Sequence, residues 1–212
     1  SGFSWHNPEQ DYTDRTGEKW WQDMLVRFRD IYLQLGADTE TANKAAAQIR
    51  PIIKNSDNYT LYPDAVDSLQ QIQDMGHINV LLSNNYPDLP DVIEQLGLSQ
   101  YFDTLFISAQ IGYEKPRAEL FSMVKKKYPN AESFFMIGDS INADIIGGKN
   151  AGMKTVLVHR GFHPDADYCY DQLISLCQIP GTGRTFGTKD KKLNYTAVSY
   201  THLRAHETSL HL

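Results

Sequence analysis

Short apolar runs that alternate with helical patterns constrain the fold of this 212-residue chain more than any other feature. The clearest runs are INVLLS (Ile78 to Ser83), SFFMI (Ser133 to Ile137) and KTVLVH (Lys154 to His159). Each is too short for a buried helix, and the β-branched residues in them favour buried parallel strands. No hairpin signal joins two strands directly. We therefore predict an α/β fold with a Rossmann-like, doubly wound parallel sheet.

The predicted elements extend this alternation along most of the chain. Residues 1–16 are polar and predict a loop. Helices are expected over 17–35, 39–54, from Pro63 to a cap at Gly76, 90–96, 118–127, 143–151 and 172–178, and further strands over 104–107 and 168–170. Pro51 is expected to end or kink the second helix. In the first helix, we expect at least one of Trp20 and Trp21 in the core, and a tryptophan there can also line a substrate pocket.

Composition limits the classes of function that the chain can serve. Apolar residues make up 41% and charged residues 22%, which is ordinary for a folded protein. The formal net charge of -6 argues against nucleic acid as the main partner, because phosphate backbones attract clustered Lys and Arg. No apolar run is long enough to span a bilayer and no signal segment opens the chain, so we expect no membrane partner. Cys169 and Cys177 cannot form a disulfide framework, which favours a reducing, cytoplasmic location.

Polar side chains stand where three predicted strands end. Ser83 and Asn84 close one strand, Lys115 lies in the EKP loop after the next, and Asp139 and Asp144 follow the strand at 133–137. Ligands of an open parallel sheet bind beyond these carboxyl ends. A hydroxyl and an ammonium can hold phosphoryl oxygens, and carboxylates suit Mg²⁺. We therefore predict phosphate binding by Ser83, Asn84 and Lys115, a catalytic role for Lys115, and metal binding by Asp139 and Asp144.

These residues resemble the motifs of the haloacid dehalogenase-like hydrolases. LLSNN is similar to the second motif of that family, with Ser83 on phosphate, and EKP is similar to the third, with Lys115. GDSINAD followed by IIGGKNAGM is similar to the fourth, with Asp139 and Asp144 as its acidic pair. The resemblance covers roughly residues 17–178. It implies Mg²⁺ and an aspartyl nucleophile that takes phosphate from a small organic phosphate, and the acidic pair favours phosphatases over metal-free dehalogenases.

The resemblance also implies how the chain is divided. Residues 1–58 would be part of an all-helical cap, and 59–179 an α/β core that lacks its first, central strand. In the family that strand ends in Asp-x-Asp and carries the nucleophile. The aspartates of this chain that come nearest to such a motif are Asp11 and Asp14, in DYTDRTG, but no apolar strand precedes them. We therefore expect that the nucleophile lies upstream of Ser1 and that this chain alone is an inactive fragment. We also expect that two neighbouring core strands lack a partner strand.

Residues 180–212 have no apolar period, and we expect an unstructured, non-native tail that packs little against the core. The run VSYTHLRAHET in this tail resembles translated sequencing-adapter read-through. GTGRTFGTK lacks the spacing of a phosphate-binding loop. His202 and His206 stand four residues apart, but no apolar face would bury a zinc-binding helix there.

The leading expectation is a fragment of a Mg²⁺-dependent phosphohydrolase whose substrate is a small phosphorylated metabolite. Two alternatives stay open. One is a non-catalytic relative that binds phosphate or a partner protein. The other is a different doubly wound binding domain, in which Asp139 and Asp144 only cap a helix and complement its dipole.

Overall fold

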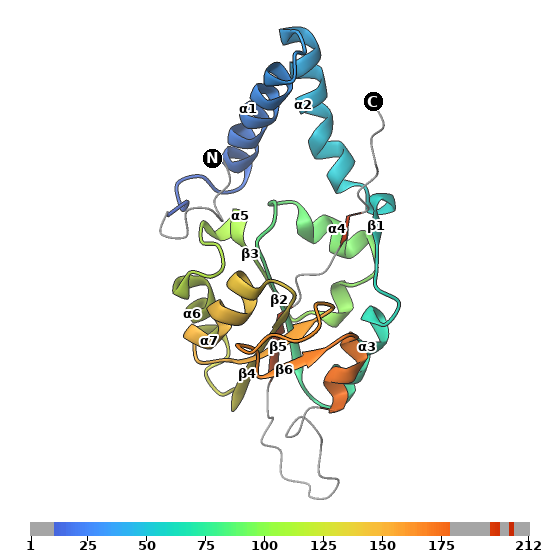
Figure 1. Cartoon of the computed structure of the whole chain (residues 1–212), viewed down its shortest axis with the longest axis vertical. Helices are drawn as coiled ribbons and strands as arrows, with labels where there is room; N and C mark the ends of the chain where they lie inside the picture. Colours follow the sequence, from blue (N-terminus) through green and yellow to red (C-terminus); the bar gives the residue numbers. More distant parts are fainter. Residues whose placement is uncertain (1–10, 179–195, 200–203, 206–212) are drawn as a thin grey trace, which may run out of the picture.

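The centre of the chain is a six-stranded sheet, seen in a computed structural model that describes residues 11–178, 196–199 and 204–205 (Figure 1). The strand order is β3-β2-β7-β4-β5-β6. The strands are β2 (Ile78–Ser83), β3 (Thr104–Ile107), β4 (Ser133–Gly138), β5 (Lys154–Val158), β6 (Tyr168–Tyr170) and β7 (Thr196–Ser199). Neighbouring strands pair in parallel throughout, so their carboxyl ends share one edge. The predicted doubly wound parallel fold is confirmed.

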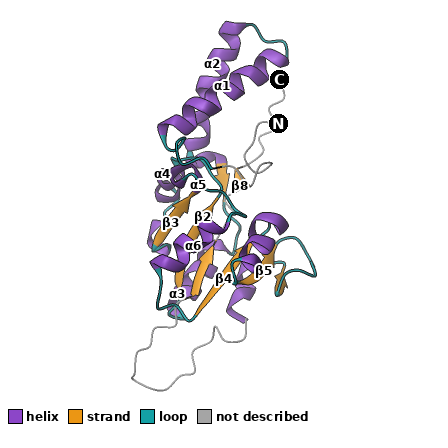
Figure 2. Cartoon of the chain, turned by 90° about the vertical axis from the view of Figure 1, so that its left-hand side faces the viewer, coloured by secondary structure: helices purple, strands orange, loops and turns teal. Residues whose placement is uncertain are grey.

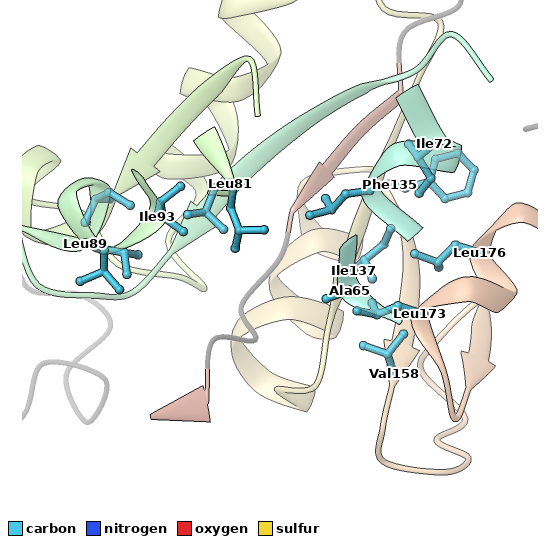
Figure 3. Close-up of a cluster of buried hydrophobic side chains, with 14 of the residues drawn as sticks. Ala65, Ile72, Leu81, Leu89, Ile93, Phe135, Ile137, Val158, Leu173 and Leu176 are labelled. Carbon is cyan, nitrogen blue, oxygen red and sulfur yellow. The ribbon is translucent and has the colours of Figure 1, made fainter. Parts of the chain in front are cut away.

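Alternate residues of the buried strands build a core on each face of the sheet. Leu81 and Ile137 belong to one buried cluster, and Leu82 and Met136 belong to another. This two-residue period is the one that a pleated strand imposes. Figure 3 shows the first cluster, in which the strand residues Leu81, Phe135, Ile137 and Val158 lie among Ala65, Ile72, Leu89, Ile93, Leu173 and Leu176. Burial of each Leu or Ile contributes about 1.5–3 kcal/mol relative to exposure.

Most helices begin and end near their predicted bounds. They are α1 (Glu18–Gln34), α2 (Thr39–Lys54), α3 (Ala65–Asp74), α4 (Leu89–Gln95) and α6 (Ala118–Lys127). The second helix does not end at Pro51, because it continues to Lys54. Three short helices were not predicted, namely η2 (Ser56–Asn58), η3 (Ser99–Tyr101) and α5 (Ser108–Ile111). Within the described residues, no helix combines the length and apolar content that a membrane crossing needs.

Helices α1 and α2 form an antiparallel hairpin that projects from the sheet (Figures 1 and 2). The turn between them begins at Gly36, whose φ of 94° favours glycine. Asp38 then caps α2 by accepting a hydrogen bond from the Thr41 backbone N–H at 2.9 Å. Trp21 is fully buried at the base of the hairpin, so the expectation of at least one core tryptophan is confirmed.

Two helical segments differ from their predictions. The chain after β4 forms a π-helix, η4 (Ile141–Ile146), followed by the short α7 (Gly147–Asn150), where one α-helix over 143–151 was expected. Single π-turns of this kind occur often at functional sites. The helix expected over 172–178 is a 3₁₀-helix, η5 (Leu173–Gln178).

The expectation that residues 180–212 form no structure with the core does not hold for residues 196–199. This segment forms β7, which pairs with both β2 and β4 and so occupies the central place where a strand was expected to be missing. The segment Arg204–Ala205 forms β8 and pairs antiparallel with β1 (Tyr59–Thr60). The periodicity missed β7 because four residues, TAVS, are too few to reveal one. The predicted loop at 1–10 and the remaining tail residues, with His202, His206 and residues 181–189, lie outside the described residues.

Candidate functional site

A cavity of about 380 Å³ opens at the carboxyl edge of the sheet, and we call it the edge cavity. Loops after β2, β3 and β4 supply its walls, so three strand ends meet there as the sequence predicts. Its lining residues are Ser83, Asn84, Asn85, Lys115, Pro116, Ser140, Asn142, Ala143 and Asp144. Four of the five predicted site residues therefore line one cavity, and Asp139 is the exception.

Lys115 and Asp144 form a buried ion pair in the edge cavity. The Lys115 Nζ lies 2.6 Å from Asp144 Oδ1, and the two side chains are 1% and 0% exposed. Burial lowers the pKa of Lys115, while the carboxylates of Asp144 and Asp139 oppose that lowering. An ammonium fixed in a shielded cavity interacts with an anion more strongly than one in water does. The pair therefore provides a positioned cation that can bind an anionic group.

The carboxylate of Asp144 is held on both of its oxygens. Oδ1 accepts from Lys115, and Oδ2 accepts a hydrogen bond from the Ser140 backbone N–H at 3.0 Å. Gly138 leaves room for this arrangement, because a Cβ at that position would overlap the Asp144 carboxylate. These contacts place the Asp144 carboxylate directly beside the Lys115 ammonium, and metal binding by Asp144 stays a prediction.

Asn84 lines the edge cavity and also contacts the Lys115 backbone. Its side-chain Nδ2 donates to the Lys115 carbonyl oxygen at 2.9 Å, and its Oδ1 accepts from the Lys115 N–H at 2.7 Å. The amide thus fixes the loop that carries the lysine. Ser83 is 4% exposed, and within the described residues its hydroxyl makes no hydrogen bond. That hydroxyl is available to a ligand.

Asp139 lies close to the edge cavity without lining it. Its side chain is 23% exposed and its Oδ2 lies 3.5 Å from Arg160 Nη2. Among the described residues, no three His, Cys, Asp or Glu side chains gather as a metal-binding cluster. A metal ion there would need oxygen atoms from water and from a bound phosphate in addition to Asp139, and Mg²⁺ commonly has this kind of coordination. Asp139 thus fits a single-carboxylate Mg²⁺ site.

Neither of the two N-terminal aspartates lies in the edge cavity. Asp11 is exposed and accepts a hydrogen bond from the Thr13 backbone N–H at 2.8 Å. The Asp14 side chain is 77% exposed beside Arg15. Among the described residues, Asp144 is the one carboxylate that lines the edge cavity, and Lys115 and Ser140 already occupy it.

A second cavity, of about 200 Å³, lies between the helical hairpin and the sheet edge, and we call it the hairpin cavity. It is lined by Tyr12, Arg15, Trp20, Asp23, Met24, Arg27 and Phe28 on one side and by Asn84, Asn85, Tyr86, Ser108, Ala109, Gly112 and Glu114 on the other. Asn84 and Asn85 line both cavities, so the two are neighbours across this asparagine pair.

Asp88 joins the hairpin to the loop that follows β2, a role that was not predicted from the sequence. Its carboxylate accepts hydrogen bonds from Trp21 Nε1 at 2.5 Å, Arg50 Nη2 at 3.1 Å and Lys54 Nζ at 3.2 Å. Burial alone would raise the pKa of Asp88, but these donors outweigh it and the pKa lies below its usual value. No local pattern reveals this contact, because Trp21 and Asp88 are far apart in the sequence.

Comparison with known proteins identifies the family. The sequence model of the haloacid dehalogenase-like hydrolases matches residues 8–152, more than half of the chain. A phosphoserine phosphatase of Thermus thermophilus is 31% identical over 140 residues, which is 65% of this chain and 55% of the relative. A glyceraldehyde 3-phosphate phosphatase of Methanopyrus kandleri is 29% identical over 147 residues, 68% of this chain and 60% of the relative. The chain thus spans between half and two thirds of these relatives.

Solved structures agree on the fold. The putative hydrolase YfnB of Bacillus subtilis superposes with a TM-score of 0.61 at 22% identity, over 74% of this chain and 71% of YfnB. A phosphatase from Thermococcus onnurineus gives a TM-score of 0.59 at 20% identity, over 76% of this chain and 90% of that protein. With the family match and the strand-end residues in one place, the chain belongs to the haloacid dehalogenase-like hydrolases.

Proposed function

We propose that this chain provides the phosphoryl-binding part of a Mg²⁺-dependent phosphohydrolase that acts on small organic phosphates. The observation that carries the proposal is the edge cavity, where the available Ser83 hydroxyl and the buried Lys115 ammonium lie together. A tetrahedral dianion needs such a donor and such a cation. The relatives named as phosphatases support the same reaction class.

In this proposal each residue of the chain has a distinct task. Ser83 and Lys115 bind the phosphoryl oxygens, Asn84 fixes the Lys115 loop, and Asp144 orients the Lys115 ammonium. Asp139 holds Mg²⁺, which would neutralise charge on the phosphoryl group when bound. The related YfnB has been solved with magnesium bound, which supports this choice of metal.

The covalent chemistry follows from the family and needs one more carboxylate. That carboxylate would bond to phosphorus while the bond from phosphorus to the ester oxygen breaks, and the ester oxygen would leave with a proton as an alcohol. Water would then release phosphate and restore the carboxylate. Because no unoccupied carboxylate lines the edge cavity in the described residues, we propose that the nucleophile comes from outside them.

Phosphate binding tests the proposal without relying on turnover. Titration of the chain with inorganic phosphate in the presence and absence of Mg²⁺ is expected to show binding that Mg²⁺ strengthens. Ser83→Ala should weaken binding about tenfold, since a hydrogen bond to a charged group contributes about 1.5–3 kcal/mol. Ser99→Ala, at an exposed serine, is the matched control. The proposal is wrong if phosphate does not bind, or if it binds equally to both variants.

One observation favours an alternative, a non-catalytic relative that binds phosphate. Within the described residues the edge cavity has a cation and a hydroxyl but no unoccupied carboxylate. Hydrolysis of p-nitrophenyl phosphate by the chain separates the two functions. Turnover above that of Lys115→Met would exclude the alternative. Binding without turnover is expected under both functions if the nucleophile comes from outside this chain, so the same assay would then be repeated on a longer protein that carries the added carboxylate.

A further inference from the structure

The hairpin cavity adjoins the edge cavity, because Asn84 and Asn85 line both. With the phosphoryl group in the edge cavity, a leaving group that extends past these two asparagines enters the hairpin cavity. The relatives do not indicate its chemistry, because the substrates in their names carry an amino acid, an aldehyde or a second phosphate. We therefore infer the chemistry of the leaving group from the residues that line the hairpin cavity.

One face of helix α1 forms a wall of the hairpin cavity. Trp20, Asp23, Met24, Arg27 and Phe28 recur at steps of three and four residues, the spacing that brings side chains to one helix face. A volume of about 200 Å³ is below the roughly 300–1,000 Å³ of pockets for drug-sized ligands. The cavity therefore suits a leaving group of a few atoms rather than a nucleoside.

Some charged side chains that line the hairpin cavity have an ion-pair partner, and one does not within the described residues. Arg15 Nη1 lies 3.5 Å from Asp23 Oδ2, so these two side chains offset one another. Arg27 is half-buried, and within the described residues its guanidinium has no hydrogen bond or ion pair. Glu114 lines the opposite wall and has partners of its own. The guanidinium of Arg27 is thus the charge in this cavity that a ligand can match.

We propose that Arg27 is a specificity-determining residue that binds an anionic group, such as a carboxylate, on the leaving group of the substrate. This inference rests on the proposed function, because it places the phosphoryl group in the edge cavity. Arginine suits the task, since its planar donors match a carboxylate or a second phosphate with two parallel hydrogen bonds. The apolar side chains of Trp20, Met24 and Phe28 strengthen the contact by excluding water.

Phosphonates test the inference, because their C–P bond resists hydrolysis and binding can be measured directly. The full chain with Mg²⁺ is titrated with 3-phosphonopropionate and 4-phosphonobutyrate, and with the uncharged-tail analogues propylphosphonate and butylphosphonate. At one of the two lengths, the carboxylate should strengthen binding about tenfold or more. Propane-1,3-diyl bisphosphonate, which carries a second phosphonate, separates a carboxylate site from a phosphate site. 2-Aminoethylphosphonate, with a cationic tail, should gain nothing.

Variants on α1 then assign the effect to one side chain. Arg27→Met should abolish the advantage of the anionic tail and leave binding of propylphosphonate unchanged, and Arg27→Lys should keep part of the advantage. Arg29→Met is the matched control, because Arg29 pairs with Asp30 at 2.8 Å and does not line the cavity. The Lys variant keeps the test informative if the Met variant folds poorly.

Other outcomes overturn the inference in distinguishable ways. If phosphate and all phosphonates bind with equal strength, Arg27 does not bind the leaving group, although the proposed function stands. If the cationic tail binds best, the cavity selects the opposite charge and the inference is wrong. If neither phosphate nor any phosphonate binds, the proposed function fails and the inference fails with it.

Discussion

Asn84 and Lys115 are joined by two hydrogen bonds, in which the Asn84 side-chain amide pairs with both the backbone N–H and the backbone carbonyl of Lys115. Nδ2 donates to the Lys115 carbonyl and Oδ1 accepts from the Lys115 N–H, at 2.9 and 2.7 Å. The residue after Ser83 thereby fixes the loop that carries the lysine. The Asn84 side chain thus links the end of β2 to the Lys115 loop, and because it uses only the Lys115 backbone, the Lys115 ammonium stays with Asp144 and can meet a ligand.

Replacement of Asn84 should loosen the lysine loop. Asn84→Ala removes both hydrogen bonds and should lower the free energy of unfolding by about 1–3 kcal/mol, because buried groups of Lys115 lose their partners. Phosphate affinity should fall as well. Urea denaturation and phosphate titration measure the two effects. Asn43→Ala, at an exposed asparagine of α2, should change neither. An unchanged stability for Asn84→Ala would contradict the positioning role.

The buried ion pair of Lys115 and Asp144 should behave as a unit. Lys115→Met or Asp144→Asn alone should cost about 3–5 kcal/mol of unfolding free energy, because each removes one charge of a buried ion pair and leaves the opposite charge behind. The double variant Lys115→Met/Asp144→Asn should cost less than the sum of the two single changes. A double-mutant cycle in urea measures the coupling. Additive costs would show that the two charges do not depend on each other.

Stability should depend on pH through Asp88. Its pKa in the folded chain lies below the value of about 3.9 expected in the unfolded chain, so its contribution is present above about pH 4 and is lost as the pH falls through the folded-state pKa. Asp88→Asn should therefore be less stable than the unmodified chain at pH 7, and the difference should shrink as the pH is lowered. Urea midpoints at several pH values test this, with Asp67→Asn at an exposed position as control.

Gly138→Ala should disturb the site through a steric effect. Its new Cβ would overlap the Asp144 carboxylate, and overpacking of this kind costs about 1–3 kcal/mol. Thermal denaturation should show the loss, together with weaker phosphate binding. If the overlap is the cause, Asp144→Ala should cost less stability in the Gly138→Ala background than in the unmodified chain. Equal costs in both backgrounds would exclude it.

The sheet was predictable because its strands β2, β4 and β5 consist mostly of buried residues. INVLLS appears in the structure as β2 with the predicted bounds, and the strands over 104–107 and 168–170 also agree. The contacts inside the site were harder to predict from the sequence. The spacing of GDSINAD predicts that Asp139 and Asp144 share the end of β4, but the π-turn of η4 sets the position of Asp144. Which oxygen of Asp144 meets Lys115 depends on packing around Gly138, and no local pattern encodes that.

Contacts between distant segments explain what the sequence did not predict. Strand β7 takes its place from pairing with β2 and β4, because a four-residue segment has little preference of its own. The cluster of Trp21, Arg50 and Lys54 around Asp88 likewise joins residues from α1, α2 and the start of α4. Each residue of that cluster has an ordinary helical neighbourhood. The function of such a residue becomes visible once the chain is folded.

The two adjacent tryptophans of helix α1 have different positions in the structure. Trp21 anchors the helix on Asp88, while Trp20 lies on the face that lines the hairpin cavity. Asp23, Met24, Arg27 and Phe28 line the same cavity and make no hydrogen bond to Asp88, whereas Trp20 also packs edge-on against Trp21 with their ring centroids 5.0 Å apart. If the hairpin cavity holds the leaving group as we propose, a few changes on this one face of α1 would alter which small ligand fits, while the residues of the edge cavity stay the same.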